Sequence, residues 1–125
     1  MTLLLDTHAF LWWLDNPRLL SKAARMAIGE GKNTVYVSAV VAWEITIKRS
    51  LGKLDSPDDL EAVMEANHFL PLPVTVPHAL AVRLLPYHHR DPFDRLLIAQ
   101  ARHEGFKLVT RDPCFSQYDV PLIVA

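Results

Sequence analysis

The sequence HRDPFDRLLIAQA, at residues 89–101, carries the strongest structural signal in this chain of 125 residues. It predicts a helix start, with Asp91 as the N-cap and Pro92 as the first helical residue. Asp94 then lies in the first turn, on the same face as the apolar residues at positions 97, 98 and 101. A carboxylate in line with a core-facing stripe is costly to desolvate unless a cation meets it. The question raised by this stretch is whether that cation is an arginine or a metal ion.

The composition fits one domain over residues 1–125, because half of the residues are hydrophobic and the length suffices for a core. Cys114 is the only cysteine, which excludes an intramolecular disulfide and a cysteine-based metal site and suits a reducing cytoplasm. The apolar start, residues 1–14, contains Asp6 and His8, has no basic leader and is too short to cross a membrane. We therefore expect a cytoplasmic protein. The net charge of −1 gives no overall attraction to nucleic acid.

Short apolar runs alternate with helical segments along the chain. Strands are expected at residues 3–5, 35–37, 107–110 and 121–124, and an extended edge segment at 69–76, which contains two prolines. Helices are expected at residues 9–14, 22–29, 39–50 and 92–104, with two more opening at Ser56-Pro57 and after Pro77. This alternation predicts an α/β fold with a parallel sheet covered on both faces, which binds ligands at the carboxyl ends of its strands.

Four carboxylates are expected at that edge. Asp6 directly follows the first strand, Asp112 follows the strand at 107–110 by one residue, and Asp94 opens its helix. Glu44 lies inside the helix that leaves the second strand, and helical side chains tilt back toward the N-terminus. Clustered carboxylates repel one another, and hard oxygen ligands suit Mg²⁺ or Mn²⁺. The sequence thus predicts a divalent-metal site.

Each acid also has a simpler explanation. Asp6 and Asp112 could be turn residues, Asp91 a helix cap, and Asp94 a partner of the helix dipole. Glu44 has the weakest such alternative, because a glutamate on an apolar stripe is seldom buried without a partner. The two candidate arginines, at positions 95 and 111, cannot neutralise four acids at once.

Other residue types give weaker signals. His88 and His89 are adjacent and no HxxxH spacing occurs, which argues against zinc. Trp12, Trp13 and Trp43 could stack on bases, but their apolar surroundings favour a core or dimer surface. Candidate contacts to substrate are the side chains of Thr7, Thr110, Arg90, Arg95 and Arg111, with strand-end hydrogen bonding as the alternative for the two threonines.

At these residues the chain resembles the PIN-domain family, specifically the VapC-type toxin ribonucleases, over essentially its whole length. The resemblance rests on residues 3–7 (LLLDT), residues 38–44 (SAVVAWE), Asp94 with its apolar helix, and residues 110–112 (TRD) followed by Phe115. It implies a three-layer α/β/α sandwich with a mostly parallel central sheet. It also implies Mg²⁺ or Mn²⁺ held by Asp6, Glu44, Asp94 and Asp112. Asp91, an additional acid typical of part of the family, is a fifth expected metal ligand.

The resemblance further implies an endoribonuclease that hydrolyses RNA phosphodiester bonds, a cognate antitoxin and a homodimer. The alternative is a catalytically silent PIN-fold module that binds RNA or protein, against which the intact acid set argues. A phosphatase using Asp6 as nucleophile would need a second acid at position 8, where this chain has His8. A dinucleotide-binding domain would need a glycine-rich turn after residue 5, and no glycine occurs there.

Overall fold

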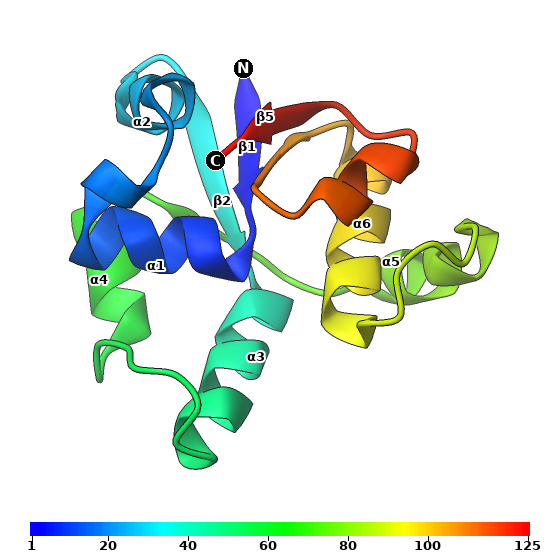
Figure 1. Ribbon diagram of the computed structural model, residues 1–125, viewed down its shortest axis with the longest axis horizontal. Helices are drawn as coiled ribbons and strands as arrows, with labels where there is room; N and C mark the ends of the chain where they lie inside the picture. Colours follow the sequence, from blue (N-terminus) through cyan, green and yellow to red (C-terminus); the bar gives the residue numbers. More distant parts are fainter.

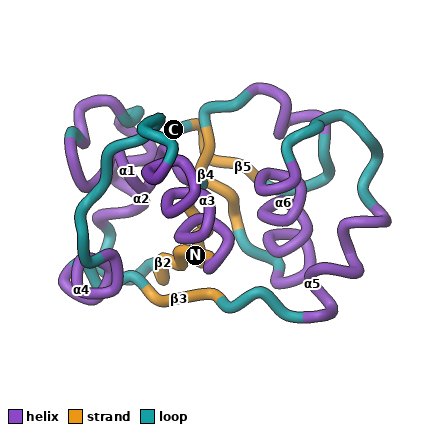
Figure 2. Tube along the Cα trace, turned by 90° about the horizontal axis from the view of Figure 1, so that it is seen from below, coloured by secondary structure: helices purple, strands orange, loops and turns teal.

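The computed structural model describes residues 1–125 and contains one five-stranded sheet. All neighbouring strands pair in parallel, in the order β3-β2-β1-β4-β5 (Figure 2). The strands are β1 (Thr2–Leu5), β2 (Thr34–Ser38), β3 (Leu70–Leu72), β4 (Lys107–Thr110) and β5 (Leu122–Val124). The expected parallel sheet is therefore confirmed, with the proline-containing β3 at an edge, where a missing ladder donor is tolerated.

Helices cover both faces of this sheet. They are α1 (Thr7–Asp15), α2 (Lys22–Gly29), α3 (Ala39–Ser50), α4 (Leu60–Ala66), α5 (Val76–Ala81) and α6 (Pro92–Glu104). Figures 1 and 2 show α1, α2 and α4 on one side of the sheet, α5 and α6 on the other, and α3 extending beyond the end of β2. The arrangement is the expected α/β/α sandwich. No helix is both long enough and apolar enough to cross a lipid bilayer.

The register of the three central strands aligns their carboxyl ends. Leu5, the last residue of β1, lies opposite Val37 in β2 and Val109 in β4. The backbone N–H of Asp6 then donates to the Val109 carbonyl at 3.0 Å. The residues that follow the three strands therefore meet at one edge of the sheet.

The core explains why β1 is an uninterrupted apolar run. Leu3, Leu4 and Leu5 are fully buried, because helices cover both faces of the central strand. Phe10 from α1 and Phe115 from the segment after β4 are the largest fully buried side chains. This packing fixes the strand ends on which the acidic residues stand.

Besides α1, which begins at Thr7 rather than at residue 9, two helix starts differ from the expectation. The helix expected to open at Ser56-Pro57 begins at Leu60, because Asp59 rather than Ser56 caps it and accepts from Ala62 N at 3.0 Å. The next helix begins at Val76, one residue before Pro77, because the Thr75 hydroxyl accepts from the backbone N–H of His78. In both cases a side chain nearer the helix satisfies its free N–H groups.

Candidate active site

Acidic residues from distant parts of the sequence meet at the carboxyl edge of the sheet. The negative charges of Asp91, Glu44 and Asp6 act on Asp94. Asp94 and Asp112 both contact the ring of His89. The structure thus brings all five acids predicted for the metal site into one neighbourhood. Within it, side-chain atoms of His89, Asp94 and Asp112 that could bind a metal lie within 4.8 Å of one another.

Asp6 is buried and is the N-cap of α1, which is a more specific role than the turn residue considered from sequence. Its Oδ1 accepts from Ala9 N at 2.8 Å. Burial raises the pKa of the Asp6 carboxyl, and the hydrogen bonds from the Thr110 hydroxyl and from Ala9 offset part of that rise. The hydrogen bonds from Ala9 N and from the Thr110 hydroxyl orient the Asp6 carboxylate, but no nearby arginine or lysine pairs with it.

Glu44 is 4% exposed, on the face of α3 that is turned toward α1. The Thr7 hydroxyl donates to Glu44 Oε1 at 2.6 Å, and Lys48 Nζ, one helical turn later, pairs with Oε2. The hydrogen bond to Glu44 is the main reason for the raised pKa of Lys48, and the charges of Asp91 and Asp94 add to it. Glu44 therefore has the partners that a buried glutamate is expected to need, the Thr7 hydroxyl and the Lys48 ammonium group.

Asp91 and Asp94 occupy the start of α6, as the sequence predicts. Asp91 Oδ1 accepts from Phe93 N at 2.8 Å and from Asp94 N at 3.3 Å, so its cap role is confirmed. Burial raises the pKa of Asp94 to about 7, and the negative charges of Asp91, Glu44 and Asp6 contribute to that rise. The His89 ring acts in the opposite direction but does not offset them. The surroundings of Asp94 therefore do not fully compensate the charge of its ionised form.

Asp112 is a cap as well, at the start of the short 3₁₀ helix Pro113–Gln117. Its Oδ1 accepts from Cys114 N at 2.9 Å, and its Oδ2 lies 3.0 Å from His89 Nε2. The same Nε2 is 2.9 Å from Asp94 Oδ2. His89 therefore stands between two acids that belong to different segments.

This donor set fits a divalent cation. The carboxylates outnumber the cationic groups beside them. Burial is the main cause of the raised pKa values of Asp6 and Asp94, and the neighbouring negative charges add to it. Oxygen donors from carboxylates are the ligands that Mg²⁺ and Mn²⁺ take. Asp6, Asp94, Glu44 and Asp112 could hold such an ion directly or through water, with Asp91 at the edge of the group.

The three arginines expected to contact substrate lie in different environments. Arg90 is exposed next to the site. Arg95 is buried, and its guanidinium donates to the carbonyls of Pro86, Val82 and Leu85 and to the Tyr118 hydroxyl. This environment does not fit a phosphate contact, because the guanidinium already binds the segment that leads into α6.

Arg111 is also occupied by contacts within the chain. Its Nε donates to the Ala125 carbonyl at 2.8 Å, its Nη2 donates to the Leu19 carbonyl, and its guanidinium lies 4.3 Å from the ring centre of Trp12. These bonds tie the C-terminus to the segment after α1. Of the three arginines, Arg90 alone has a side chain without a partner inside the protein.

An aromatic pair stands beside the acids. Trp43 immediately precedes Glu44 and is 58% exposed, and its ring meets that of Phe93 edge to face at 5.0 Å between centroids. Phe93 immediately precedes Asp94. The expectation of a core position does not hold for Trp43, because it points away from the apolar face of α3. Trp12 and Trp13 are half-buried.

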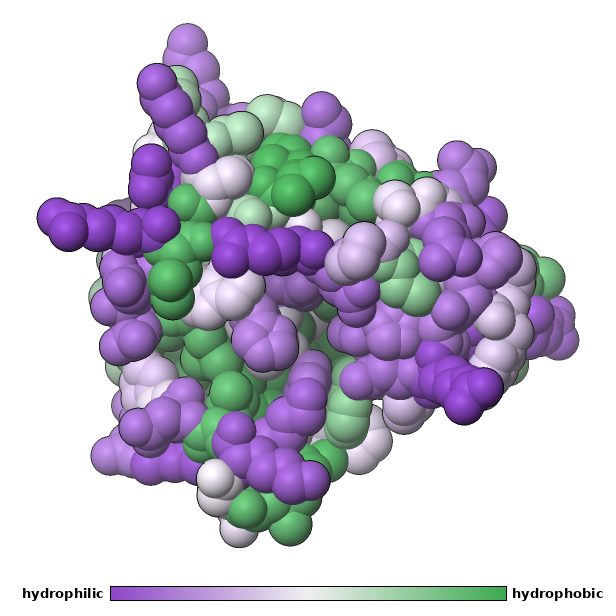
Figure 3. All heavy atoms as spheres, viewed as in Figure 1, coloured by the Kyte–Doolittle hydropathy of each residue, from purple (hydrophilic) through white to green (hydrophobic).

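A cleft of about 390 Å³ runs between α1 and the segment after α3. The lining of this cleft includes His8, Trp12 and Leu54. Figure 3 shows the face of the molecule seen in Figure 1, where hydrophilic side chains surround a central hollow with hydrophobic atoms beside it. His8 lies two residues after Asp6, so the cleft begins close to the acidic residues.

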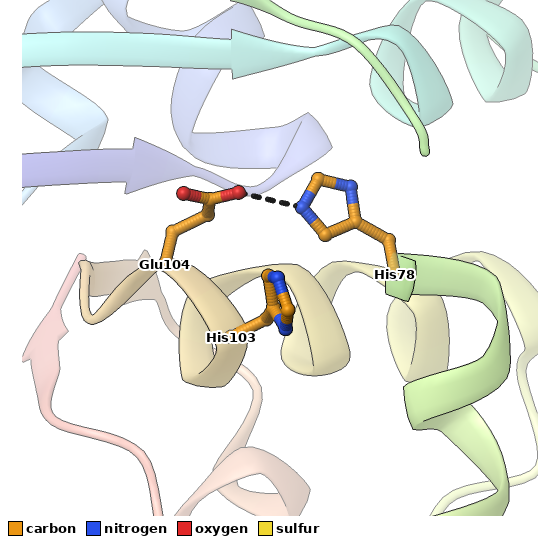
Figure 4. A group of neighbouring side chains, drawn as sticks. All are labelled: His78, His103 and Glu104. Carbon is orange, nitrogen blue, oxygen red and sulfur yellow. Dashed lines mark hydrogen bonds and ion pairs between the residues drawn. The ribbon is translucent and has the colours of Figure 1, made fainter. Parts of the chain in front are cut away.

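A second group of possible metal ligands lies away from these acids, on α5 and α6. Figure 4 shows the His78 ring directed at Glu104, with Nε2 and Oε1 2.8 Å apart, and His103 beside them. His78 Nδ1 accepts from Thr75 N at 3.1 Å, so the ring proton of the neutral form is on Nε2 and points at Glu104. The His78–Glu104 pair therefore links α5 to α6 by a hydrogen bond.

Sequence reasoning missed two residues of the site, His89 and Lys48. Lys48 has a readable signal, because it follows Glu44 by four residues on the same helix and such pairs meet. His89 has none of comparable strength, because it lies in a loop whose path depends on tertiary contacts. Its place just before Asp91-Pro92 marks only that it is near the start of α6.

Known proteins resemble this chain over nearly its full length. The family model of the PIN domain matches residues 3–121. Ribonuclease VapC22 of Mycobacterium tuberculosis is 32% identical over 114 residues, covering 89% of this chain and 87% of that protein. DNA-bound VapBC from Salmonella typhimurium superposes with a TM-score of 0.71 at 15% identity, covering 98% of this chain and 97% of the other. VapBC2 from Rickettsia felis, bound to a promoter DNA fragment, gives 0.67 at 14% identity and 98% coverage of both chains.

At 14–15% identity the two superpositions show a common fold and no more. The family match and the identity to a VapC ribonuclease go further, because the family model spans residues 3–121 and the relative is 32% identical over 89% of this chain. The chain therefore belongs to the PIN-domain family, as a VapC-type member.

Proposed function

We propose that this protein is an endoribonuclease that hydrolyses RNA phosphodiester bonds with the help of Mg²⁺ or Mn²⁺. The observation that carries the proposal is the uncompensated Asp94 carboxyl, whose pKa of about 7 reflects burial among Asp91, Glu44 and Asp6. A fold that buries these acids together without arginine partners is stabilised by a divalent cation. The name of the 32% identical relative, a ribonuclease, supports RNA as the substrate.

In this proposal Asp6 and Asp94 hold the ion, with Glu44 and Asp112 completing the site directly or through water. When bound, such an ion supplies Lewis-acid activation of water and offsets the charge on the phosphate oxygens. The chain keeps its own ligands in place: Thr7 orients Glu44, and Thr110 and Ala9 N orient Asp6. With a pKa of about 7, Asp94 is partly protonated near neutral pH, and a bound cation would favour its ionised form.

Binding of the RNA strand is assigned to groups around the acids. Arg90 is exposed and free to contact a flanking phosphate. Lys48, one third exposed beside Glu44, can meet a second phosphate. Trp43 and Phe93 present aromatic surface on which a base of single-stranded RNA can stack.

The protein is further proposed to be the toxin of a toxin–antitoxin pair and to form a homodimer. Support comes from the fold, because the structures named VapBC resemble this chain along its whole length, as does a protein described as a toxin–antitoxin complex from Klebsiella pneumoniae. An antitoxin that places a cationic side chain among the acids would fit their charge. Co-purification with the product of a neighbouring gene tests this pairing.

The alternative is a PIN-fold module that binds RNA or protein without cutting. The feature that favours the nuclease is the convergence of Asp6, Glu44, Asp94 and Asp112, which a binding module would not need to maintain. A silent module would bind RNA equally well with EDTA and with Mn²⁺, and would leave it intact.

The test is cleavage of a fluorescently labelled single-stranded RNA pool by the purified chain in Mn²⁺, Mg²⁺ and EDTA. We expect cleavage in Mn²⁺ or Mg²⁺, none in EDTA, and at least a 100-fold loss in Asp94→Asn. Asp119→Asn is the matched control, because Asp119 is exposed and makes no ion pair. Equal cleavage by wild type and Asp94→Asn would contradict the proposed site, and no cleavage with either ion would favour the silent module.

A further inference from the structure

His89 holds two of the proposed metal ligands together. Its Nε2 donates to Asp112 Oδ2 at 3.0 Å and lies 2.9 Å from Asp94 Oδ2. We propose that His89 is a positioning residue that fixes the separation of Asp94 and Asp112 before the cation binds, without itself being a ligand. This inference rests on the proposed function, because it assigns a role relative to that metal site.

The hydrogen bonds of the imidazole determine which nitrogen carries the proton. Asp91 N–H donates to His89 Nδ1 at 3.2 Å, so Nδ1 presents a lone pair. In the neutral ring the proton is then on Nε2, the atom that faces the two carboxylates. Direct coordination of a metal by Nε2 would need a free lone pair on Nε2. The proton of the neutral ring would then be on Nδ1, where it would face the Asp91 N–H. The ring is therefore arranged as a donor to the ligands.

The backbone that carries His89 is fixed by a single phenol. Tyr118 Oη accepts from His89 N at 2.8 Å and from His88 N at 3.1 Å. The buried Arg95 guanidinium donates to the same oxygen at 3.4 Å and to three carbonyls of the preceding segment. The His89 ring itself packs edge to face against the buried Phe115. These contacts explain why Arg95 is buried next to an acidic site, because its guanidinium stabilises the loop that carries His89.

The position of His89 between Asp94 and Asp112 bears on the repulsion between these two carboxylates. When both are ionised, Asp94 and Asp112 repel each other, yet a cation held by both needs them at a set distance. His89 Nε2 donates to Asp112 Oδ2 and contacts Asp94 Oδ2, while no protein group donates to Asp94 Oδ1, which stays available to a cation. Groups that hydrogen-bond to metal ligands in this way commonly contribute a factor of about 10–100 in metal affinity.

The inference is tested by measuring Mn²⁺ affinity, by calorimetry on metal-free protein, in three variants. Gln at position 89 can place an amide N–H where Nε2 stands, and Asn can only reach the position of Nδ1. We expect His89→Ala and His89→Asn to bind Mn²⁺ about 10–100-fold more weakly, and His89→Gln to recover most of the loss. His103→Ala, which removes an exposed ring on the far end of α6, should bind as wild type does.

Folding is checked by melting each variant in EDTA. His89→Asn keeps an acceptor for the Asp91 N–H, so it tests the carboxylate contact even if His89→Ala does not fold. Unchanged Mn²⁺ affinity in folded His89→Asn would overturn the positioning role. A histidine nitrogen coordinated to Mn²⁺ in pulsed electron paramagnetic resonance, together with no recovery in His89→Gln, would overturn it in favour of a ligand. Absence of Mn²⁺ binding by wild type would instead contradict the metal site itself.

Discussion

The Thr7 hydroxyl donates a hydrogen bond of 2.6 Å to Glu44 Oε1 and so connects the first residue of α1 to the middle of α3. Both residues are buried, at 6% and 4% exposed. Because Asp6 precedes Thr7 and caps the same helix, this bond sets the position of one proposed metal ligand relative to another. These two ligands are therefore linked through α1 and α3 rather than through a flexible loop.

Replacing Thr7 by Val should remove this link at nearly constant volume. We expect the free energy of unfolding to fall by about 1–3 kcal/mol, because a buried carboxylate loses a donor, and RNA cleavage to fall as well. Thr7→Ser keeps the hydroxyl and should restore most of both. Urea unfolding and the cleavage assay check the pair, and equal behaviour of the Val and Ser variants would contradict the role of the hydroxyl.

The raised pKa of Asp94 predicts how stability depends on pH without metal. Between about pH 4 and pH 7 the folded protein binds a proton at Asp94 that the unfolded chain has released. Stability in EDTA should therefore fall as pH rises through this range and level off above about pH 7. Asp94→Asn should flatten that part of the curve and be more stable than wild type at pH 8, by about 2–3 kcal/mol. Urea unfolding in EDTA at a series of pH values measures both, and a variant with an unchanged slope would refute the assignment.

Adding Mn²⁺ should reverse the effect in wild type. Metal binding requires the ionised carboxylates, so the melting temperature at pH 8 should rise with Mn²⁺ concentration. The same shift should be small in Asp94→Asn. A thermal melt at millimolar Mn²⁺ that moves equally for both proteins would mean that the ion binds elsewhere.

Substitutions of Arg95 and Arg90 should have separate effects, the first on stability and the second on RNA binding. Arg95→Leu removes donors from buried carbonyls and from Tyr118, so it should lower the free energy of unfolding by about 2–4 kcal/mol. Arg90→Ala should leave the melting temperature unchanged and weaken RNA binding, with a reduced dependence on salt. The reverse pattern in melting and binding experiments would restore Arg95 as a phosphate contact.

Trp43 should contribute to RNA affinity and not to folding, because its ring is 58% exposed. We expect Trp43→Ala to weaken binding of a short single-stranded RNA, measured in EDTA to prevent cleavage, by about 1–3 kcal/mol. Trp43→Phe should lose less, since it keeps an aromatic face. Trp13→Phe is a suitable control, because Trp13 is half-buried and its ring nitrogen donates to Asn67.

The sequence carries enough information for the sheet and its acids, because these depend on local patterns. One apolar run ends directly before Asp6 and another ends at Thr110, with one residue between it and Asp112, which places both acids at strand ends. The Asp91-Pro92 pair defines the start of α6. Glu44 could be placed because the direction of helical side chains is fixed by geometry. Each of these inferences needs only neighbouring residues and the parallel arrangement of the strands.

What the sequence does not reveal depends on contacts between distant segments. Arg95 reads as a surface cation next to an acid, yet it is buried because the segment before α6 folds over it and offers three carbonyls. His89 reads as one of two adjacent histidines, and only the packing of Tyr118 turns it toward Asp94 and Asp112. The start of α4 was missed because several nearby residues can cap a helix and tertiary packing selects Asp59.

The central claim is that Asp6 and Asp94, with Glu44 and Asp112, hold a divalent cation. Anomalous diffraction from crystals grown or soaked with Mn²⁺ addresses it most directly. The account predicts an anomalous peak at the carboxyl edge of the sheet, with oxygens of Asp6 and Asp94 about 2.1–2.3 Å away, and its absence in Asp94→Asn. A peak bound only by His78, His103 and Glu104, or no peak among the four acids at saturating Mn²⁺, would contradict it.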